Sequence, residues 1–222
     1  MKIGLVGAGD VGRTLASLWA QAGHQVFLSS RHPEQLSSVV GELGLAAQAG
    51  TVQQAAAFGD VIFLAINYST VDEAIQAIGN AADGKIVIDA TNPLRYAEGG
   101  GTERVINDNE IAGQVMANKL PNTRIVKAFT TMWTGYLQQH AHRDGEKAAV
   151  ALAGDDLADK KVVASLIKDA GFEPVDIGTL AESRPIDPPS PIWNKVLTAN
   201  EVREHVVQFR ESARARDPHL SN

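Results

Sequence analysis

The stretch Lys2-Ile3-Gly4-Leu5-Val6-Gly7-Ala8-Gly9-Asp10-Val11-Gly12 stands near the start of the chain and decides its fold. Residues 2–6 are mostly apolar, which predicts a buried strand. The three glycines after them have the spacing of the turn that joins strand to helix in dinucleotide-binding βαβ units. In such a turn Gly7 permits the tight bend, Gly9 lets a pyrophosphate approach the backbone, and Gly12 lets the helix pack close to the strand. The free N–H groups at the helix N-terminus then attract the anion.

The residues after this loop supply the context that a glycine motif needs. Apolar side chains recur at helical spacing and are followed by a second apolar run, Gln25–Ser30, so the unit has the required length of roughly thirty residues. We therefore interpret residues 7–12 as a dinucleotide-binding loop, with a purely structural glycine turn as the alternative. The apolar residues of the predicted helix are Leu15, Leu18, Trp19 and Ala22.

Short β-branched runs continue to alternate with amphipathic stretches, which is typical of an α/β fold. We predict a Rossmann-type doubly wound, mostly parallel sheet with a C-terminal helix. The expected organisation is a dinucleotide-binding domain with a small C-terminal elaboration over residues 1–192, a helix over 193–213 and a flexible tail over 214–222, with a flexible internal stretch at Gly99–Gly101. The predicted strands are Lys2–Gly7, Gln25–Ser30, a short one near Ala46, Val61–Ile66, Lys85–Ala90, Arg124–Phe129, Ala148–Ala153 and Glu173–Ile177.

The end of the second predicted strand indicates which dinucleotide binds. An Asp or Glu there would accept hydrogen bonds from the ribose hydroxyls of NAD, whereas this chain has Ser29, Ser30 and Arg31. A guanidinium with one or two hydroxyls suits a 2′-phosphate, so we predict NADP(H). The alternative is a polar strand end that leads into the next helix, and the two interpretations are compatible.

Polar residues also follow two later predicted strands. Asn67 and Tyr68 come after Val61–Ile66, and Asn92 and Pro93 come after Lys85–Ala90. Ligands of open α/β sheets bind at the carboxyl ends of the strands. Asn67 or Asn92 is therefore a candidate partner of the nicotinamide ribose or carboxamide, although plain turn residues have the same pattern.

Composition narrows the function classes. The 222 residues carry a net charge of −6 with interspersed signs, which argues against nucleic acid as the main partner. The absence of cysteine excludes disulfides, thiolate nucleophiles and iron–sulfur clusters. Apolar runs are strand-sized and no export leader precedes the first strand, so we expect a cytoplasmic protein that does not bind membranes. His140 and His142 have no third ligand nearby, so we predict no metal site.

Several segments together resemble the reduced coenzyme F420:NADP oxidoreductases, and the same scaffold resembles the cytosolic NADPH-binding domains of transmembrane ferric reductases. The similarity extends from Met1 to about Trp193. It implies hydride exchange between NADP(H) and a deazaflavin, coenzyme F420, or a flavin-like acceptor, with the two rings stacked at the carboxyl edge of the sheet. The segments that carry it are residues 2–9, 29–31, 89–94, 126–131, 153–156 and 171–178.

The resemblance also implies a second set of site residues beside the predicted cofactor site. Residues 127–130 would border the acceptor ring, and Arg184 would meet its anionic tail; the chain departs from the family where Pro188-Pro189-Ser190-Pro191 replaces a more apolar segment. The predicted cofactor-binding residues are Gly7, Ala8, Gly9, Asp10, Val11, Gly12, Ser29, Ser30, Arg31, Asn67, Tyr68, Asn92 and Pro93. The predicted second-substrate residues are Lys127, Ala128, Phe129, Thr130 and Arg184.

No catalytic acid or base is predicted, because ring-to-ring hydride transfer depends mainly on positioning. Two other functions remain open: an NADPH-binding redox sensor without turnover, and an NADP-dependent reductase of a small carbonyl or imine substrate. The predicted partner is a small redox molecule. A homodimer is a further hypothesis, since the last helix carries an apolar stripe that could be exposed or could pack on the chain's own sheet. The stripe consists of Val196, Leu197, Val202, Val206 and Phe209.

Overall fold

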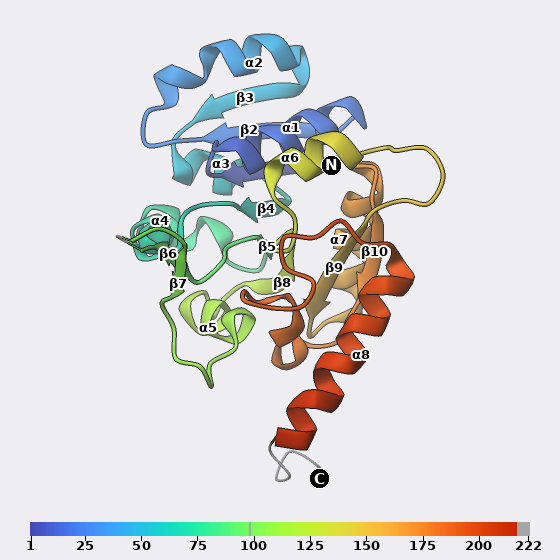
Figure 1. Cartoon of the computed structure of the whole chain (residues 1–222). Helices are drawn as coiled ribbons and strands as arrows, with labels where there is room; N and C mark the ends of the chain where they lie inside the picture. Colours follow the sequence, from blue (N-terminus) through green and yellow to red (C-terminus); the bar gives the residue numbers. More distant parts are fainter. Residues whose placement is uncertain (98, 217–222) are drawn as a thin grey trace.

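The computed structural model describes residues 1–97 and 99–216 and is built around one eight-stranded sheet (Figure 1). The strand order is β10-β9-β8-β5-β4-β1-β2-β3, in which β9 pairs antiparallel with β8 and the other neighbours pair parallel. The predicted mostly parallel, Rossmann-type fold is therefore confirmed. The strands are β1 (Lys2–Val6), β2 (Gln25–Ser29), β3 (Ala47–Gly50), β4 (Val61–Leu64), β5 (Ile86–Asp89), β8 (Arg124–Ala128), β9 (Ala149–Gly154) and β10 (Glu173–Asp176).

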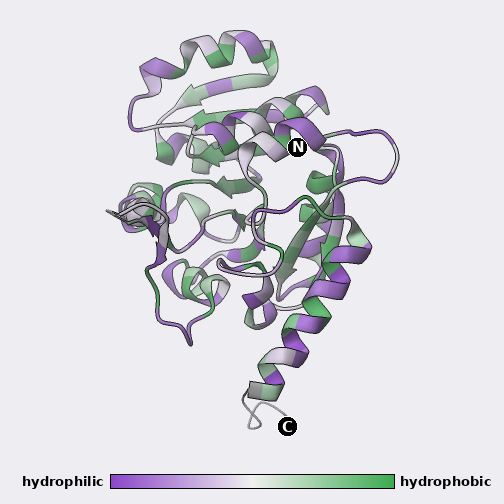
Figure 2. Cartoon of the chain, viewed as in Figure 1, coloured by the Kyte–Doolittle hydropathy of each residue, from purple (hydrophilic) through white to green (hydrophobic). Residues whose placement is uncertain are grey.

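Helices cover both faces of the sheet because the central strands are apolar on both sides. Successive residues alternate between two clusters. Phe63 and Ile88 pack with the helices over residues 10–21 and 157–169, whereas Ile62 and Val87 pack with those over residues 71–78 and 112–119. Figure 2 shows the apolar residues concentrated on the sheet and the last helix largely hydrophilic. The helices are α1 (Asp10–Gln21), α2 (Ser37–Leu43), α3 (Val52–Phe58), α4 (Val71–Ile78), α5 (Ala112–Lys119), α6 (Thr134–His140), α7 (Leu157–Asp169) and α8 (Ala199–Arg216).

Two glycines of the first loop are required by the backbone itself. Gly7 has a φ of +105°, and a Cβ there would lie 2.2 Å from the carbonyl oxygen of Ala65. A Cβ on Gly12 would lie 2.1 Å from the carbonyl oxygen of Gly7. The expected tight turn and the close packing of helix on strand are both confirmed. A Cβ on Gly9, in contrast, would meet open space.

A small antiparallel hairpin, β6 (Leu94–Tyr96) and β7 (Thr102–Arg104), was not predicted from the sequence. It follows β5 in the chain, and its base is closed where the N–H of Val105 donates to the carbonyl oxygen of Pro93. Gly99–Gly101 lies in its turn, where Gly100 and Gly101 have positive φ.

The last helix differs from its prediction in its bounds, and its packing decides between the two alternatives left open for its apolar stripe. It begins at Ala199 instead of 193 and continues to Arg216, and residues 217–222 of the predicted tail lie outside the described residues. Val202 and Val206 are buried against the sheet, in a cluster with Ala151, Val175 and Ile177. The apolar stripe therefore packs on the chain's own sheet, which removes the observation that motivated a dimer. The division into a domain, helix and tail stays a prediction.

Among the described residues, no helix combines the length and the apolar character needed to span a bilayer.

Replacing Gly12 by Ala tests the contact between α1 and the end of β1. Because the new methyl group would overlap the Gly7 carbonyl, we expect a loss of about 1–3 kcal/mol in the free energy of unfolding, measured by urea denaturation. Gly41→Ala is the matched control, since a Cβ there meets open space within α2 and should stabilise the helix by about 0.5–1 kcal/mol. Equal effects of the two substitutions would contradict the close packing.

Candidate functional site

The glycine loop and the start of α1 form an open, polar surface at the carboxyl end of β1. Gly9 is the N-cap residue of α1 and supplies no side-chain cap, so the N–H groups of the first turn are left for another partner. Arg13, which sequence reasoning did not single out, donates from Nε to the carbonyl oxygen of Ala8 at 2.7 Å. This bond holds the loop and places the positive charge of the Arg13 guanidinium beside it. The arrangement suits a pyrophosphate.

The end of β2 presents two of its three predicted residues to solvent. Arg31 is exposed, and no hydrogen bond or ion pair engages its guanidinium among the described residues. The Ser30 hydroxyl accepts a hydrogen bond from the N–H of His32 at 2.9 Å, which fixes its position. The prediction for the Ser29 hydroxyl is wrong. It is fully buried and donates to the carbonyl oxygen of Leu5 at 2.8 Å, so it joins β2 to β1 and has no access to a ligand.

Asn67 and Tyr68 follow β4, the strand beside β1 in the sheet. Asn67 is exposed at the start of a short 3₁₀ turn, and its carbonyl oxygen accepts a hydrogen bond from Thr70. The Tyr68 hydroxyl is buried and has no hydrogen-bond partner among the described residues. Burial, with the negative charge of Asp89 in addition, raises the pKa of Tyr68 to about 12. The phenol is therefore a proton donor without an acceptor, close to the predicted cofactor end of β4.

Asn92 is half-buried after β5 and is held toward β8. Its Nδ2 donates to the carbonyl oxygen of Thr130 at 3.0 Å, which leaves Oδ1 buried without a hydrogen-bond partner among the described residues. Pro93 is buried beside it. An unpaired buried acceptor is costly unless a ligand supplies a donor. Asn92 is thus oriented for a ligand that offers an N–H or O–H group.

A buried ion pair holds the residue before Asn92 in place. Lys127 of β8 is fully buried and donates from Nζ to Asp89 at 3.1 Å and to the carbonyl oxygen of Thr91 at 3.0 Å. The other oxygen of Asp89 accepts from the N–H and the hydroxyl of Thr91 at 2.9 and 2.6 Å. Thr91 is therefore held at its N–H and hydroxyl by Asp89 and at its carbonyl oxygen by Lys127.

Three of the predicted second-substrate residues lie in the core. Lys127 and Ala128 are fully buried, and the Phe129 ring packs edge-on against Trp19 and Phe63. The expected contact of these three side chains with an acceptor ring is therefore wrong in this structure, where all three face the core. Thr130 is also buried, with its hydroxyl donating to the carbonyl oxygen of Ile186, although its backbone carbonyl meets Asn92.

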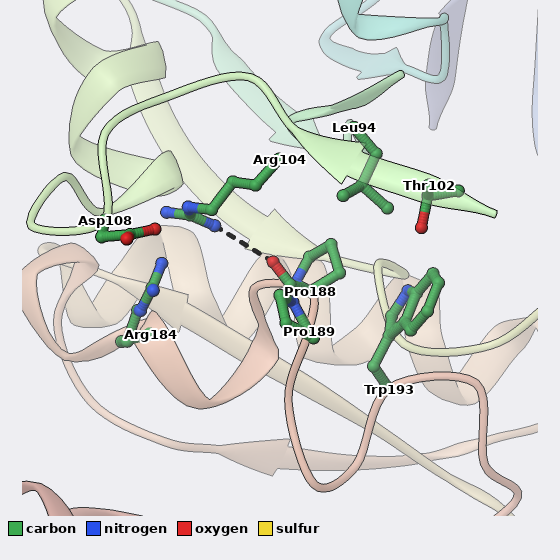
Figure 3. Close-up of a pocket in the computed structure, with 8 residues that line it drawn as sticks. All are labelled: Leu94, Thr102, Arg104, Asp108, Arg184, Pro188, Pro189 and Trp193. Carbon is green, nitrogen blue, oxygen red and sulfur yellow. Dashed lines mark hydrogen bonds between the residues drawn. The ribbon is translucent and has the colours of Figure 1, made fainter. Parts of the chain in front are cut away.

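Arg184, the remaining predicted second-substrate residue, lines a pocket between the β6–β7 hairpin and the segment before α8 (Figure 3). The pocket has a volume of about 290 Å³. Arg104, at the end of β7, lines it beside Arg184. The structure thus groups the glycine loop, Asn67 and Asn92 along adjacent strand ends, and places Arg184 in a separate pocket on the hairpin side. The lining residues are Leu94, Thr102, Arg104, Asp108, Arg184, Pro188, Pro189 and Trp193.

Comparison with known proteins confirms the predicted resemblance. Residues 2–93 match the family model described as NADP oxidoreductase coenzyme F420-dependent. The F420-dependent NADP reductase of Methanothermobacter thermautotrophicus is 27% identical over 226 residues, which cover 91% of this chain and 92% of that protein. Metalloreductase STEAP3 of Rattus norvegicus is 29% identical over 189 residues, which cover 84% of this chain. Those residues are 36% of the metalloreductase, so this chain spans about a third of its length.

Solved structures agree with the sequence relationship. A hypothetical protein from Sinorhizobium meliloti superposes with a TM-score of 0.78 and 27% identity, covering 89% of this chain and 95% of that one. A candidate F420-dependent NADP reductase from Arthrobacter sp. FB24 superposes with a TM-score of 0.75 and 27% identity, covering 83% of this chain and 87% of that one. The relationship therefore extends beyond the first half of the chain.

Lys127→Met tests the buried pair beneath Asn92. Because Asp89 would be left buried without its cation, we expect the free energy of unfolding to fall by about 3–5 kcal/mol. The exposed Lys161→Met is the control and should change stability by less than about 0.5 kcal/mol. In the double variant Lys127→Met/Asp89→Asn we expect part of the loss to be recovered in chemical denaturation. A loss no larger than that of the control would contradict the role assigned to the pair.

Proposed function

We propose that this chain is an NADPH-dependent oxidoreductase that transfers a hydride between NADP(H) and a deazaflavin such as coenzyme F420, or a flavin-like acceptor. One observation carries the proposal: the open glycine loop at the N-terminus of α1 lies beside a strand end that offers Ser30 and Arg31 and no carboxylate within residues 29–32. That combination favours a phosphorylated dinucleotide over NAD. The names of the relatives supply the reaction class and the acceptors to be tried first.

The cofactor would lie across the carboxyl ends of β2, β1 and β4. The N–H groups of the first turn of α1 would bind the pyrophosphate, and the exposed Arg31 guanidinium with the Ser30 hydroxyl would bind the 2′-phosphate. The open space at Gly9 leaves the backbone accessible to the phosphates. Ser29, whose hydroxyl is buried, has no part in this proposal.

The nicotinamide end would be recognised by Asn92. Its buried Oδ1 lacks a donor, and the carboxamide N–H₂ or a ribose hydroxyl would supply one. The bond from Nδ2 to the Thr130 carbonyl fixes the amide, and the Asp89–Lys127 pair fixes the preceding Thr91. Asn67, exposed at the end of β4, would face the same region from the neighbouring strand.

The protein's contribution to such a reaction is mainly geometric. The nicotinamide supplies the hydride, and residues of this chain have to orient it and exclude water. Transfer between two rings held at roughly 3–3.5 Å needs no acid or base in the protein. A rigid Asn92 on a fixed loop is therefore more useful here than a titratable group.

Turnover distinguishes this function from an NADPH sensor. The intact protein is mixed with NADPH and, in separate reactions, coenzyme F420, FMN or ferric citrate, and the nicotinamide absorbance is followed. Oxidation of NADPH with a deazaflavin or flavin is expected. NADPH binding by calorimetry with no oxidation by any acceptor would favour the sensor and contradict the enzyme.

Arg31→Gln tests the choice of NADP(H). Loss of a charge-assisted contact to the 2′-phosphate should raise the Kd for NADPH by about 10- to 100-fold and leave that for NADH nearly unchanged. Arg31→Lys, which keeps the charge, should lose less. Kd values are measured by calorimetry. An unchanged ratio of the two Kd values would mean that the phosphate is bound elsewhere.

Gly9→Leu tests the approach of the pyrophosphate. Because a Cβ at Gly9 points into open space, the variant should fold with nearly the parent's unfolding midpoint. A bulky side chain there would nonetheless block both NADPH and NADH, and we expect binding of each to weaken by at least about tenfold. Retained affinity in a folded variant would remove the dinucleotide interpretation of the loop.

A further inference from the structure

Asn92 is held from a distant part of the chain, the segment that precedes α8. Residues 90–93 have no regular secondary structure, and Pro93 has no backbone N–H to donate. The direction of the Asn92 amide therefore depends on contacts that other elements supply. Two routes of such contacts begin at neighbouring residues of that segment, Ile186 and Asp187.

The first route passes through Thr130 by two hydrogen bonds. The Thr130 hydroxyl donates to the carbonyl oxygen of Ile186 at 3.0 Å, and the Thr130 carbonyl oxygen accepts from Asn92 Nδ2 at 3.0 Å. Thr130 is only 4% exposed, so water has little access to compete for either bond. One residue thus ties the Asn92 amide to the segment before α8.

The second route begins at Asp187 and passes through Lys127. The Asp187 carboxylate is fully buried: one oxygen accepts from the N–H of Ala112 at 2.8 Å, and the other lies 4.0 Å from Lys127 Nζ. Lys127 in turn donates to the carbonyl oxygen of Thr91, the residue before Asn92, at 3.0 Å. The ammonium group that holds Thr91 is therefore placed by Asp187 as well as by its partner on β5.

The segment at the start of both routes is itself anchored. It opens with a short 3₁₀ turn, and the Ile186 side chain is fully buried in one cluster with Val202 and Val206 of α8. Next to it, the carbonyl oxygen of Pro188 accepts from Arg104 at 3.1 Å (Figure 3). Both routes to Asn92 thus begin at a fixed point of the fold.

Together the routes determine which atom of the Asn92 amide is left for a ligand. Nδ2 is committed to the Thr130 carbonyl, and Oδ1 is the free acceptor. An amide that could turn over would offer a donor as readily as an acceptor. It would then lose its ability to distinguish a ligand N–H₂ from a group that has no N–H. A hydride transfer also slows when the group that orients the donor ring is displaced.

We propose that Thr130 and Asp187 are positioning residues for the nicotinamide, which hold the Asn92 amide with Oδ1 directed to the carboxamide N–H₂ of the cofactor. The part about the nicotinamide rests on the proposed function, whereas the hold on the Asn92 amide does not. In this role Thr130 acts through Asn92 and does not contact an acceptor ring. Asp187 acts through Lys127 and needs no access to a ligand.

The first test compares NADP⁺ with its 3-acetylpyridine analogue, in which a methyl group replaces the carboxamide N–H₂. By calorimetry the parent should bind NADP⁺ at least about tenfold more tightly, because only the carboxamide has an N–H for Asn92 Oδ1. Thr130→Val keeps the branched shape and removes the hydroxyl, so the preference should fall below about threefold. Thr130→Ser, which keeps the hydroxyl, should retain most of it.

Asp187→Asn tests the charge at the start of the second route. An Asn can still accept from the N–H of Ala112, but it does not attract the Lys127 ammonium group. We expect the preference for NADP⁺ to fall by at least about threefold. If this variant does not fold, Thr130→Val decides the proposal alone.

The matched controls remove the same chemical groups away from the site. Thr123→Val removes a hydroxyl bond to the carbonyl oxygen of Leu120 at 2.8 Å, and Asp159→Asn removes a buried carboxylate that pairs with Arg124 at 2.6 Å. Both variants should keep the parent's preference, even where they lower stability. Equal binding of the two dinucleotides to the parent, or an undiminished preference in folded Thr130→Val, would overturn the proposal.

The second test follows the Asn92 amide in the protein without cofactor. The ¹H–¹⁵N signals of its N–H₂ group are assigned with Asn92→Asp and compared between variants. They should move or broaden in Thr130→Val and stay unchanged in Thr123→Val. If they respond in this way but the parent does not bind NADP(H), the proposed function fails while the hold on Asn92 stands. If NADP(H) binds and the signals are unchanged in Thr130→Val, the positioning role fails and the proposed function stands.

Discussion

The close approach of α1 to the end of β1 is the constraint on which the rest of the structure depends. The helix can begin immediately after the strand only because Gly12 has no side chain where the Gly7 carbonyl lies, and because Gly7 adopts a φ of +105°. This geometry directs the N-terminus of α1 toward the carboxyl edge of the sheet. It does so between β1 and β4, where the chain changes direction across the sheet and where ligands of such folds bind.

The fold was predictable where local sequence determines local structure. All eight sheet strands were found within a few residues of their bounds. The inner strands are buried on both faces and appear as apolar runs, whereas the edge strands β3 and β10 are shorter in apolar residues and partly exposed. The hairpin was not found, since Leu94–Tyr96 and Thr102–Arg104 are three residues each, mostly exposed and without apolar alternation. Its position depends on contacts that the local pattern does not contain, such as the bond from Arg104 to the carbonyl of Pro188, 84 residues away.

The backbone shape of the candidate site was predictable from the sequence, whereas the directions of several of its side chains were not. Glycine spacing describes a backbone shape, and Gly7 and Gly12 have the conformations expected of them. The direction of a polar side chain at a strand end depends on its alternation and on partners elsewhere. Ser29 faces the interior and donates to the carbonyl oxygen of Leu5, and Lys127 can be buried because Asp89, 38 residues earlier, accepts a hydrogen bond from its ammonium group. A lysine in an apolar strand can indicate such a partner, but the partner cannot be identified from the spacing.

The buried charges connect the surroundings of Asn92 to the pocket that Arg104 and Arg184 line. Lys127 contacts Asp89 and Thr91 on the side of Asn92, and it lies 4.0 Å from Asp187 on the side of the two arginines. Isolated burial of any of these groups would be strongly unfavourable, so each requires its neighbours to remain in place. The surroundings of Asn92 and the positions of Arg104 and Arg184 therefore depend on one connected set of buried contacts.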